Sequence, residues 1–182
     1  DLVWIGCELG FFFSLDGGAH WTELKNNMPT LAINDFVIHP RDNDLVLGSH
    51  GRGIWILDAV QSIQELTLEV RAKDAHLFTL SPAQQIEYTG EKAHQGDMFF
   101  RGENPPRGAI IDFWLREVPE EPPVLSFIDV QGDVVARMEV EEPNAGINRE
   151  VWDLEYDRHY AGPGMEWAES PAPGGFFVMP GS

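Results

Sequence analysis

The sequence has one cysteine, few basic residues and no long hydrophobic run. Because Cys7 stands alone, an internal disulfide and a cysteine-based metal site are both excluded. The chain holds 30 Asp and Glu residues against 12 Lys and Arg residues, a net charge of −18. Such a surface repels phosphate groups, so nucleic acid and anionic membranes are unfavourable partners. No apolar run approaches the roughly 18 residues of a membrane-spanning helix.

Helical periodicity is also scarce along the chain. Most apolar runs are short, β-branched or aromatic, and bounded by Gly, Pro, Asn or Asp, which predicts strands. One short helix is expected near 59–66, and Gly132 is expected to form a hairpin turn. The predicted strands lie near 2–7, 10–15, 20–24, 33–38, 45–49, 53–58, 109–117, 123–130, 133–140 and 149–156.

The predicted strands of the second half carry an alternating pattern. Ile111, Phe113 and Leu115 are expected on one face of their strand, and Trp152 and Leu154 on one face of theirs. This pattern predicts a sheet with one buried face, in which Trp152 packs as a core anchor between sheets; stacking of Trp152 on a carbohydrate is the alternative.

The first 60 residues contain an internal repeat. Residues 2–16 align with residues 45–58 at a spacing of 42 to 43, and each copy predicts a strand, a short turn and a second strand. This spacing is in the range of a four-stranded propeller blade. The matched positions are Gly6 with Gly48, Gly10 with Gly53, and residues 11–13 with residues 54–56.

Residues 14–21 read Ser-Leu-Asp-Gly-Gly-Ala-His-Trp, a polar turn between two apolar segments. Asp16 lies two residues after a hydroxyl, so its carboxylate can accept backbone N–H groups of its own turn. Gly17 and Gly18 permit a positive φ without steric cost, and Trp21 can pack on the hairpin. A structural turn is the favoured interpretation, and a catalytic role for Asp16 is the alternative.

The spacing of Ser14, Asp16, Gly18 and Trp21 resembles the Asp-box of BNR-repeat propellers, a group that includes sialidases and sortilin-type receptors. His20 stands where that motif usually has threonine. In the family, the Asp-box lies at the periphery of a blade and away from the central channel. The resemblance therefore implies a structural role for these residues.

Two longer segments extend the resemblance. Residues 37–60 look like the last blade of bacterial sortilin-type propellers, which are often described as glycosyl-hydrolase-like on fold alone. Residues 97–182 resemble the immunoglobulin-like or fibronectin-III-like module that follows such propellers, a fold also found in the flagellar hook-capping protein. The matching segments of that module are 104–115, 126–138 and 146–156.

The resemblance implies an all-β chain in which the last blades of a β-propeller are followed by an immunoglobulin-like β-sandwich. Residues 1–60 are expected to form the last one or two blades, 61–96 a linker, and 97–182 a sandwich that lacks its last strand. Since a propeller ring needs ~4–8 blades, we expect a C-terminal fragment of a longer protein with further blades upstream. Proteins of this architecture are commonly exported, to the periplasm, the outer surface or the medium.

A second candidate site lies in the segment Gly-Ser-His-Gly-Arg-Gly, residues 48–53. Gly51 and Gly53 flank Arg52 and present it on a tight bend, where His50 and Arg52 could line a channel and hold a carboxylate or a sugar hydroxyl. The alternative is that Arg52 pairs with one of the many acidic residues of this chain.

Other polar and aromatic residues suggest weaker sites. Trp167 could stack on a carbohydrate, or could plug the edge of the sandwich. The run from Asp42 to Asp44 offers three oxygen side chains in a row, but it does not reproduce a calcium-binding loop, and a plain turn is the favoured interpretation. The histidines are scattered without zinc spacing. We therefore expect no metal and no cofactor.

The sequence supplies no reaction centre. The acidic pairs Glu120/Glu121, Glu141/Glu142 and Asp153/Glu155 are expected in turns or on exposed strand faces, where they remain solvated, and none is assigned as catalytic. We expect a non-catalytic, C-terminal part of an exported BNR/sortilin-like propeller protein with a binding or assembly role, and a carbohydrate or an envelope protein as partner. The alternative is part of a glycoside hydrolase, sialidase-like or glucanase-like, whose catalytic residues lie mostly upstream.

Overall fold

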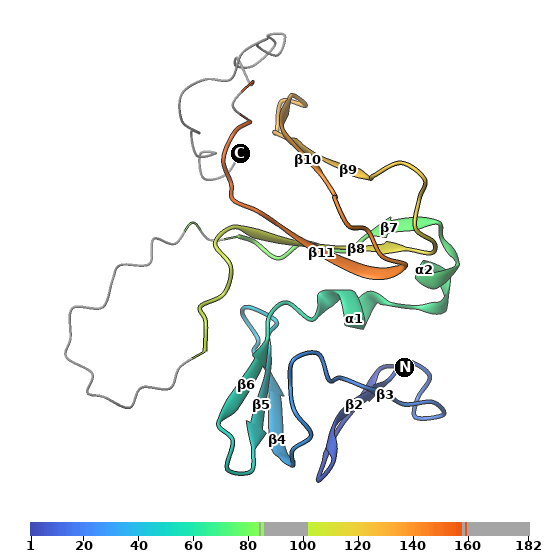
Figure 1. Ribbon diagram of the computed structural model, residues 1–182, viewed down its shortest axis with the longest axis vertical. Coiled ribbons are helices and arrows are strands. Elements are labelled where there is room, and N and C mark those ends of the chain that lie inside the picture. The colour runs from blue at the N-terminus through green and yellow to red at the C-terminus, as the bar shows by residue number, and fades with distance from the viewer. Residues whose placement is uncertain (84, 86–101, 158, 160–182) are drawn as a thin grey trace, which may run out of the picture. The chain divides into compact units, whose positions relative to one another are not determined.

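The chain folds mainly into antiparallel β-strands, as the sequence predicts (Figure 1). A computed structural model describes residues 1–83, 85, 102–157 and 159. The chain divides into two compact units. The first comprises residues 1–81 and 112–116, and the second holds the other described residues.

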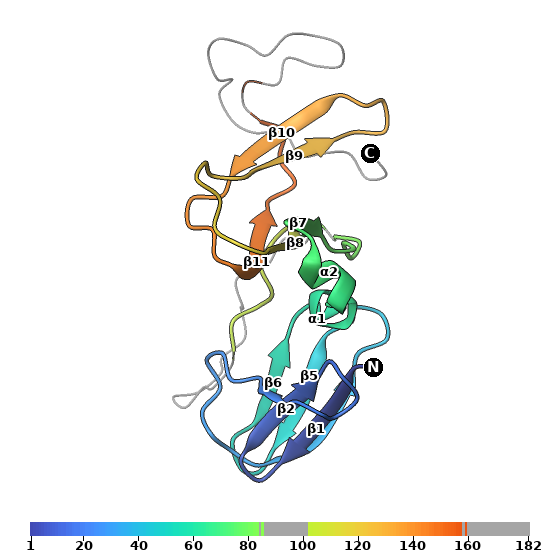
Figure 2. The same ribbon diagram turned by 90° about the vertical axis from the view of Figure 1, so that its right-hand side faces the viewer.

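The first unit is built around antiparallel sheets that follow one another along the chain (Figure 2). One sheet has the order β1-β2-β3 and the next has the order β4-β5-β6. The six strands predicted for this region are confirmed, with ends that shift by at most two residues. They are β1 (Val3–Cys7), β2 (Gly10–Ser14), β3 (Thr22–Glu23), β4 (Ile33–Ile38), β5 (Leu45–Ser49) and β6 (Ile54–Leu57).

The hairpins β1–β2 and β5–β6 have the same register. Positions that match in the sequence repeat also match in their cross-strand pairing, so the repeat is structural as well as sequential. The pairs are Trp4↔Phe13 and Val46↔Ile56, Ile5↔Phe12 and Leu47↔Trp55, and Gly6↔Phe11 and Gly48↔Ile54.

A short helical connection follows the second sheet. The helix predicted near 59–66 is present as α1 (Gln61–Glu65). Two elements were not predicted: α2 (Leu68–Ala72), whose first turn is capped by the Thr67 hydroxyl accepting the Val70 N–H at 3.2 Å, and β7 (Ala75–Leu77). In this unit β7 pairs antiparallel with the last residues of β8 (Ala109–Leu115). The helices of the described chain are too short and too polar to cross a membrane.

Strand β8 is more buried than its alternating pattern predicts. Ile111, Phe113 and Leu115 are buried, as expected, but Asp112 between them is buried too. The Ser62 hydroxyl donates to its carboxylate at 2.6 Å. Burial removes the hydrogen bonds that a carboxylate makes with water, and the hydrogen bond from Ser62 replaces one of them.

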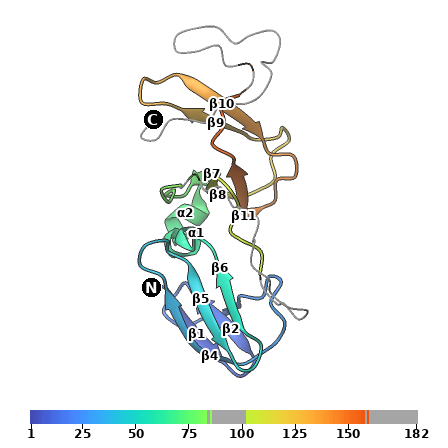
Figure 3. The same ribbon diagram turned by 90° about the vertical axis from the view of Figure 1, so that its left-hand side faces the viewer.

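The second unit contains the hairpin of β9 (Val124–Ile128) and β10 (Val134–Glu139) (Figure 3). Its turn is the predicted one, with Gly132 at a φ of 93°. The strand expected at 149–156 is displaced: β11 (Gly146–Trp152) starts earlier and ends earlier, and it lies beside β8. Leu154 has a φ of 66°, which strand geometry excludes. The prediction that Trp152 and Leu154 share a strand face is therefore wrong.

Candidate functional site

The turn at residues 14–20 is held by its own side chains. The Ser14 hydroxyl donates to Asp16 Oδ1 at 2.8 Å and accepts the Gly18 N–H at 2.8 Å. Asp16 Oδ1 also accepts the His20 N–H at 2.9 Å, and Asp16 Oδ2 lies 2.6 Å from His20 Nδ1. Gly17 and Gly18 have φ values of 75° and 101°, which is the freedom predicted for them. His20, which stands where the motif that this turn resembles usually has threonine, thus contributes its backbone N–H and its ring to the turn.

These contacts also determine the charge state of Asp16. The backbone N–H of His20, then its ring and the Ser14 hydroxyl, hold the pKa of the Asp16 carboxyl well below its usual range. A general acid needs a raised pKa, so this carboxylate is suited to holding the turn and unsuited to proton donation. Trp21 lies over the same turn, with Cζ2 at 3.5 Å from the position a Gly18 Cβ would take.

The Asp16→Asn variant is expected to lower the melting temperature of the first unit by roughly 4–8 °C at pH 7. The folded state lowers the pKa of Asp16, so its carboxylate stabilises the fold above the unfolded value of 3.8, and this contribution is lost as the pH falls through the folded value. The difference between wild type and variant should therefore shrink below about pH 4. Thermal denaturation across a pH series measures it.

Glu8→Gln is the control for that series, since Glu8 is an exposed carboxylate in the neighbouring β1–β2 turn. It removes the same charge and should leave the melting temperature nearly unchanged. Equal effects of the two variants, or a difference that grows as the pH falls, would contradict the structural role assigned to Asp16.

The bend predicted around Arg52 joins β5 to β6. Gly51 and Gly53 have φ values of 74° and 75°. The Ser49 hydroxyl donates to the Gly53 carbonyl at 2.6 Å, and the Trp55 indole N–H donates to the Arg52 carbonyl at 3.1 Å. These bonds fix the backbone of the bend and present the Arg52 side chain to solvent.

His50 and Arg52 are both exposed on this bend. Their side chains make no hydrogen bond or ion pair with any residue that the structure describes. The guanidinium is therefore available to a carboxylate or to hydroxyl groups, and the binding role of these residues stays a prediction.

The acidic run at residues 42–44 uses its oxygen atoms within the protein. Arg41 donates from Nε and Nη2 to both carboxylate oxygens of Asp42 at 2.7 Å, and this contact lowers the pKa of Asp42 and raises the pKa of Arg41. Asp44 Oδ1 accepts the Ala59 N–H at 2.9 Å, and Asn43 exchanges amide hydrogen bonds with Gln64. Within the described ranges, no cluster of His, Cys, Asp or Glu side chains could hold a metal ion.

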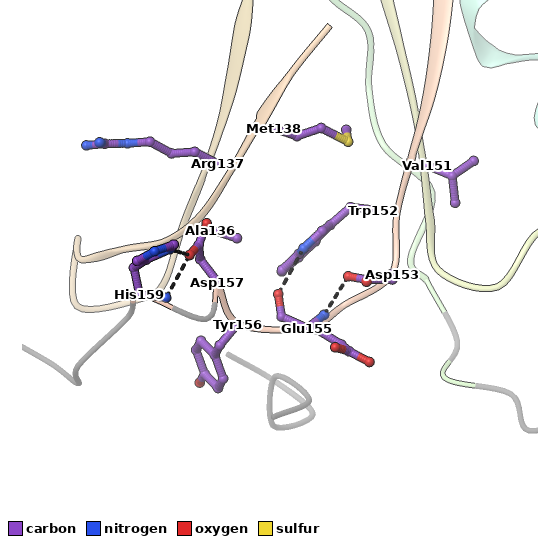
Figure 4. A pocket seen from close by; sticks show the side chains of 10 residues that line it. All are labelled: Ala136, Arg137, Met138, Val151, Trp152, Asp153, Glu155, Tyr156, Asp157 and His159. Atoms are coloured by element: carbon purple, nitrogen blue, oxygen red, sulfur yellow. Dashed lines mark hydrogen bonds and ion pairs between the residues drawn. The ribbon is translucent and has the colours of Figure 1, made fainter. Parts of the chain in front are cut away.

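A cavity of about 440 Å³ lies in the second unit, between β10, the end of β11 and the following turn (Figure 4). Trp152 forms part of its wall. The indole stacks on the ring of Phe127 with 4.1 Å between centroids, and its N–H donates to the Glu155 carbonyl at 3.1 Å. Trp152 thus packs within its unit, and it also contributes a surface to the cavity.

The acidic groups around this cavity stabilise the turn that bounds it (Figure 4). Asp153 Oδ1 accepts the Glu155 N–H at 3.0 Å, and Asp157 Oδ1 accepts the His159 N–H at 2.8 Å and lies 3.0 Å from His159 Nδ1. The sequence predicts Asp153 and Glu155 to be solvated charges in a turn or on an exposed strand face. The sequence signal for this turn is an acidic segment placed directly after a tryptophan.

The predicted site residues do not come together in one place. Both the turn at residues 14–20 and the Arg52 bend belong to the first unit, where the first joins β2 to β3 and the second joins β5 to β6. None of them lines the cavity beside Trp152. Trp167 lies outside the described residues.

The repeat sheets each have two faces, because successive side chains of a strand point to opposite sides. We call face A the side formed by Trp4, Gly6, Phe11 and Phe13 in the first sheet and by their counterparts Val46, Gly48, Ile54 and Ile56 in the second. We call face B the side formed by Val3, Ile5 and Phe12 in the first sheet and by their counterparts Leu45, Leu47 and Trp55 in the second.

Face A of the first sheet packs against face B of the second. The ring of Phe11 meets that of Phe36 edge-on at 4.9 Å, and Phe11 shares a buried cluster with Leu45 and Leu47. Gly6 permits this approach, because a Cβ there would lie 2.9 Å from Ile33 Cγ2. The contact joins different faces of equivalent sheets, so it is a head-to-tail contact.

The outward faces of this pair are also apolar. On face A of the second sheet, Ile54 is 71% exposed and Ile56 is 61% exposed, and Val37 lies beside them. On face B of the first sheet, Val3 and Ile5 are exposed. Contiguous exposed apolar surface of this kind is typical of an interaction site.

Comparison of the chain with family models, with curated proteins and with solved structures finds no match.

Proposed function

We propose that this chain is a non-catalytic part of an exported BNR/sortilin-like propeller protein and that its first unit acts in assembly. One observation carries the proposal: the outward faces of the paired repeat sheets are apolar, and they are built from the same repeat positions as the two faces that pack together. Ile54 occupies the repeat position of Phe11, which the neighbouring sheet covers, and Ile56 occupies the repeat position of Phe13 on the same face.

A head-to-tail contact repeats itself when both outer faces are free, and it then produces a ring or an open row. Face A of the second sheet is free, and its residues occupy the same repeat positions as face A of the first sheet, which is covered. Face B of the first sheet is free, and its residues occupy the same repeat positions as face B of the second sheet, which is covered. Each outer face therefore suits a further sheet of the same kind. Burial of apolar surface contributes about 25 cal/mol per Å², and it favours this contact despite the chain's net charge of −18.

Asp16 and Asp42 do not have the electrostatics of a glycosidase acid. A glycosidase needs a carboxylic acid with a raised pKa opposite a second carboxylate. The pKa values of Asp16 and Asp42 are both lowered. The His20 ring contacts the Asp16 carboxylate, and Arg41 donates a hydrogen bond to the Asp42 carboxylate.

Sedimentation velocity of the chain over a range of concentrations tests the assembly role. We expect the sedimentation coefficient to rise with concentration, because face A of one copy can cover face B of another. The double substitution Ile54→Lys and Ile56→Lys should abolish the rise, since it places two charges on an apolar contact.

The control is the pair Val124→Lys and Ile128→Lys on β9 of the second unit, where the side chains are 56% and 61% exposed. These match the exposure of the test positions but lie outside the repeat, and association should persist. A wild-type chain that stays monomeric at every concentration, or equal loss of association in both double variants, would contradict the proposal.

A further inference from the structure

Strand β6 has an open edge where its counterpart in the repeat has a neighbour. In the first sheet, β2 lies between β1 and β3. In the second sheet, β6 pairs with β5 on one side, and no described strand pairs with it on the other. After β6 the chain turns away, with the Val60 N–H donating to the Asn43 carbonyl at 3.0 Å.

The repeat indicates which atoms of β6 are unpaired. In the first sheet the Leu24 N–H donates to the Phe11 carbonyl at 2.8 Å, and Phe13 pairs with Thr22. The counterparts of Phe11 and Phe13 are Ile54 and Ile56. Their backbone groups therefore face the open side, whereas Gly53 faces β5, since its carbonyl accepts the Ser49 N–H at 3.2 Å.

A small groove lies beside β6. It is lined on one side by Trp55, Ile56 and Leu57 of β6 and on the other by the segment 24–28, which leads out of β3. Its lining includes the apolar side chains of Leu24, Met28 and Leu47. A strand laid beside β6 with the register of β3 would place one side chain opposite Trp55, as Glu23 lies opposite Phe12, and thus on the side of the groove.

We infer that β6 binds an extended peptide as an added antiparallel strand, with an apolar side chain directed into the groove opposite Trp55. Main-chain hydrogen bonds to Ile54 and Ile56 provide affinity, and the groove selects the side chain. The residues on either side of the anchor lie beside Ile54 and Ile56 on face A, where β-branched residues fit best. The inference concerns the edge of the sheet, so it does not depend on the proposed assembly of its faces.

A peptide copied from the neighbouring sheet is the probe. It spans Ala19–Asn26, capped at both ends, and carries the change Glu23→Leu to supply the apolar anchor. In the full chain, kept dilute enough to be monomeric, saturating peptide should slow amide hydrogen exchange of Ile56 by at least roughly tenfold. The unchanged peptide, with Glu23, should bind more weakly, because its carboxylate would be desolvated in the groove.

The Ile56→Pro variant tests whether the backbone N–H of Ile56 faces the open side of β6 and bonds the peptide. Proline removes an N–H that faces the open side and leaves the ladder to β5 intact, a position in which edge strands tolerate it. We expect it to weaken peptide binding at least about tenfold. Ile56→Thr keeps the N–H and should bind like wild type.

A second measurement covers the case in which Ile56→Pro does not fold. N-methylation of the peptide at Thr22, the residue that pairs with Phe13 in the first sheet, removes a hydrogen bond to β6 and leaves the protein unaltered. It should reduce binding to the same extent. Unchanged exchange at Ile56 under saturating peptide, or equal binding of the methylated and unmethylated peptides, would overturn the inference.

Discussion

Replacing Gly108 by alanine is expected to destabilise the second unit by about 3 kcal/mol or more. Gly108 has a φ of 125°, which residues with a Cβ rarely adopt. An alanine Cβ would overlap the carbonyl oxygen of Trp152 and lie 2.8 Å from its carbonyl carbon and 3.1 Å from Asp153 Cα. Since these are backbone atoms at the end of β11, no side-chain rotation relieves the overlap.

The consequence should extend to the cavity. Displacing the Trp152 backbone moves the indole away from Phe127 and from the Glu155 carbonyl, and these contacts hold the acidic turn in place. Denaturant unfolding followed by tryptophan fluorescence measures the loss. Gly132→Ala is the matched control, because Gly132 also has a positive φ, 93°, but a Cβ there meets nothing within 4 Å. Its cost should stay near 1 kcal/mol. Equal costs for the two variants would contradict the proposed packing.

Replacing Phe11 by alanine is expected to cost the first unit about 3–5 kcal/mol. The side chain is 0% exposed, stacks on Trp4 with 5.7 Å between centroids, and contacts Phe36 edge-on. Its removal leaves a cavity between the two sheets that aromatic neighbours on rigid strands cannot fill. The melting temperature of dilute protein, followed by circular dichroism, reports the loss.

Ile54→Ala is the control that the repeat itself provides. Ile54 has the same place in the register as Phe11 but is 71% exposed. In dilute protein its truncation should change stability by less than about 0.5 kcal/mol. A Phe11→Ala effect no larger than that of Ile54→Ala would mean that face A of the first sheet is not the buried one.

Much of the first unit could be predicted from the sequence because its determinants are local. The strands of the repeat are short apolar runs punctuated by Gly, Asn and Asp, and their ends are correct within two residues. The turn at residues 14–20 is held by contacts among its own residues, so the spacing of Ser14 and Asp16 along the chain is sufficient to predict that Asp16 bonds within this turn.

Features that depend on distant residues were not predictable in this way. Asp112 is buried on β8 because Ser62, 50 residues earlier, donates a hydrogen bond to it. The cavity beside Trp152 requires β10 and the turn after β11 to lie together, and β11 ends early because Leu154 adopts a left-handed φ. Helix α2 has only five residues and depends on its Thr67 cap, a signal too short to stand out from its surroundings.

The central claim is that equivalent sheets of this chain contact one another head to tail through faces A and B. Methyl NMR with a soluble paramagnetic probe tests it directly. In dilute protein the probe should broaden the methyl signals of both Ile54 on face A and Val3 on face B. At high concentration both sets should become protected together, because each contact covers one face of either kind. Protection of only one set, or of neither, would contradict the claim.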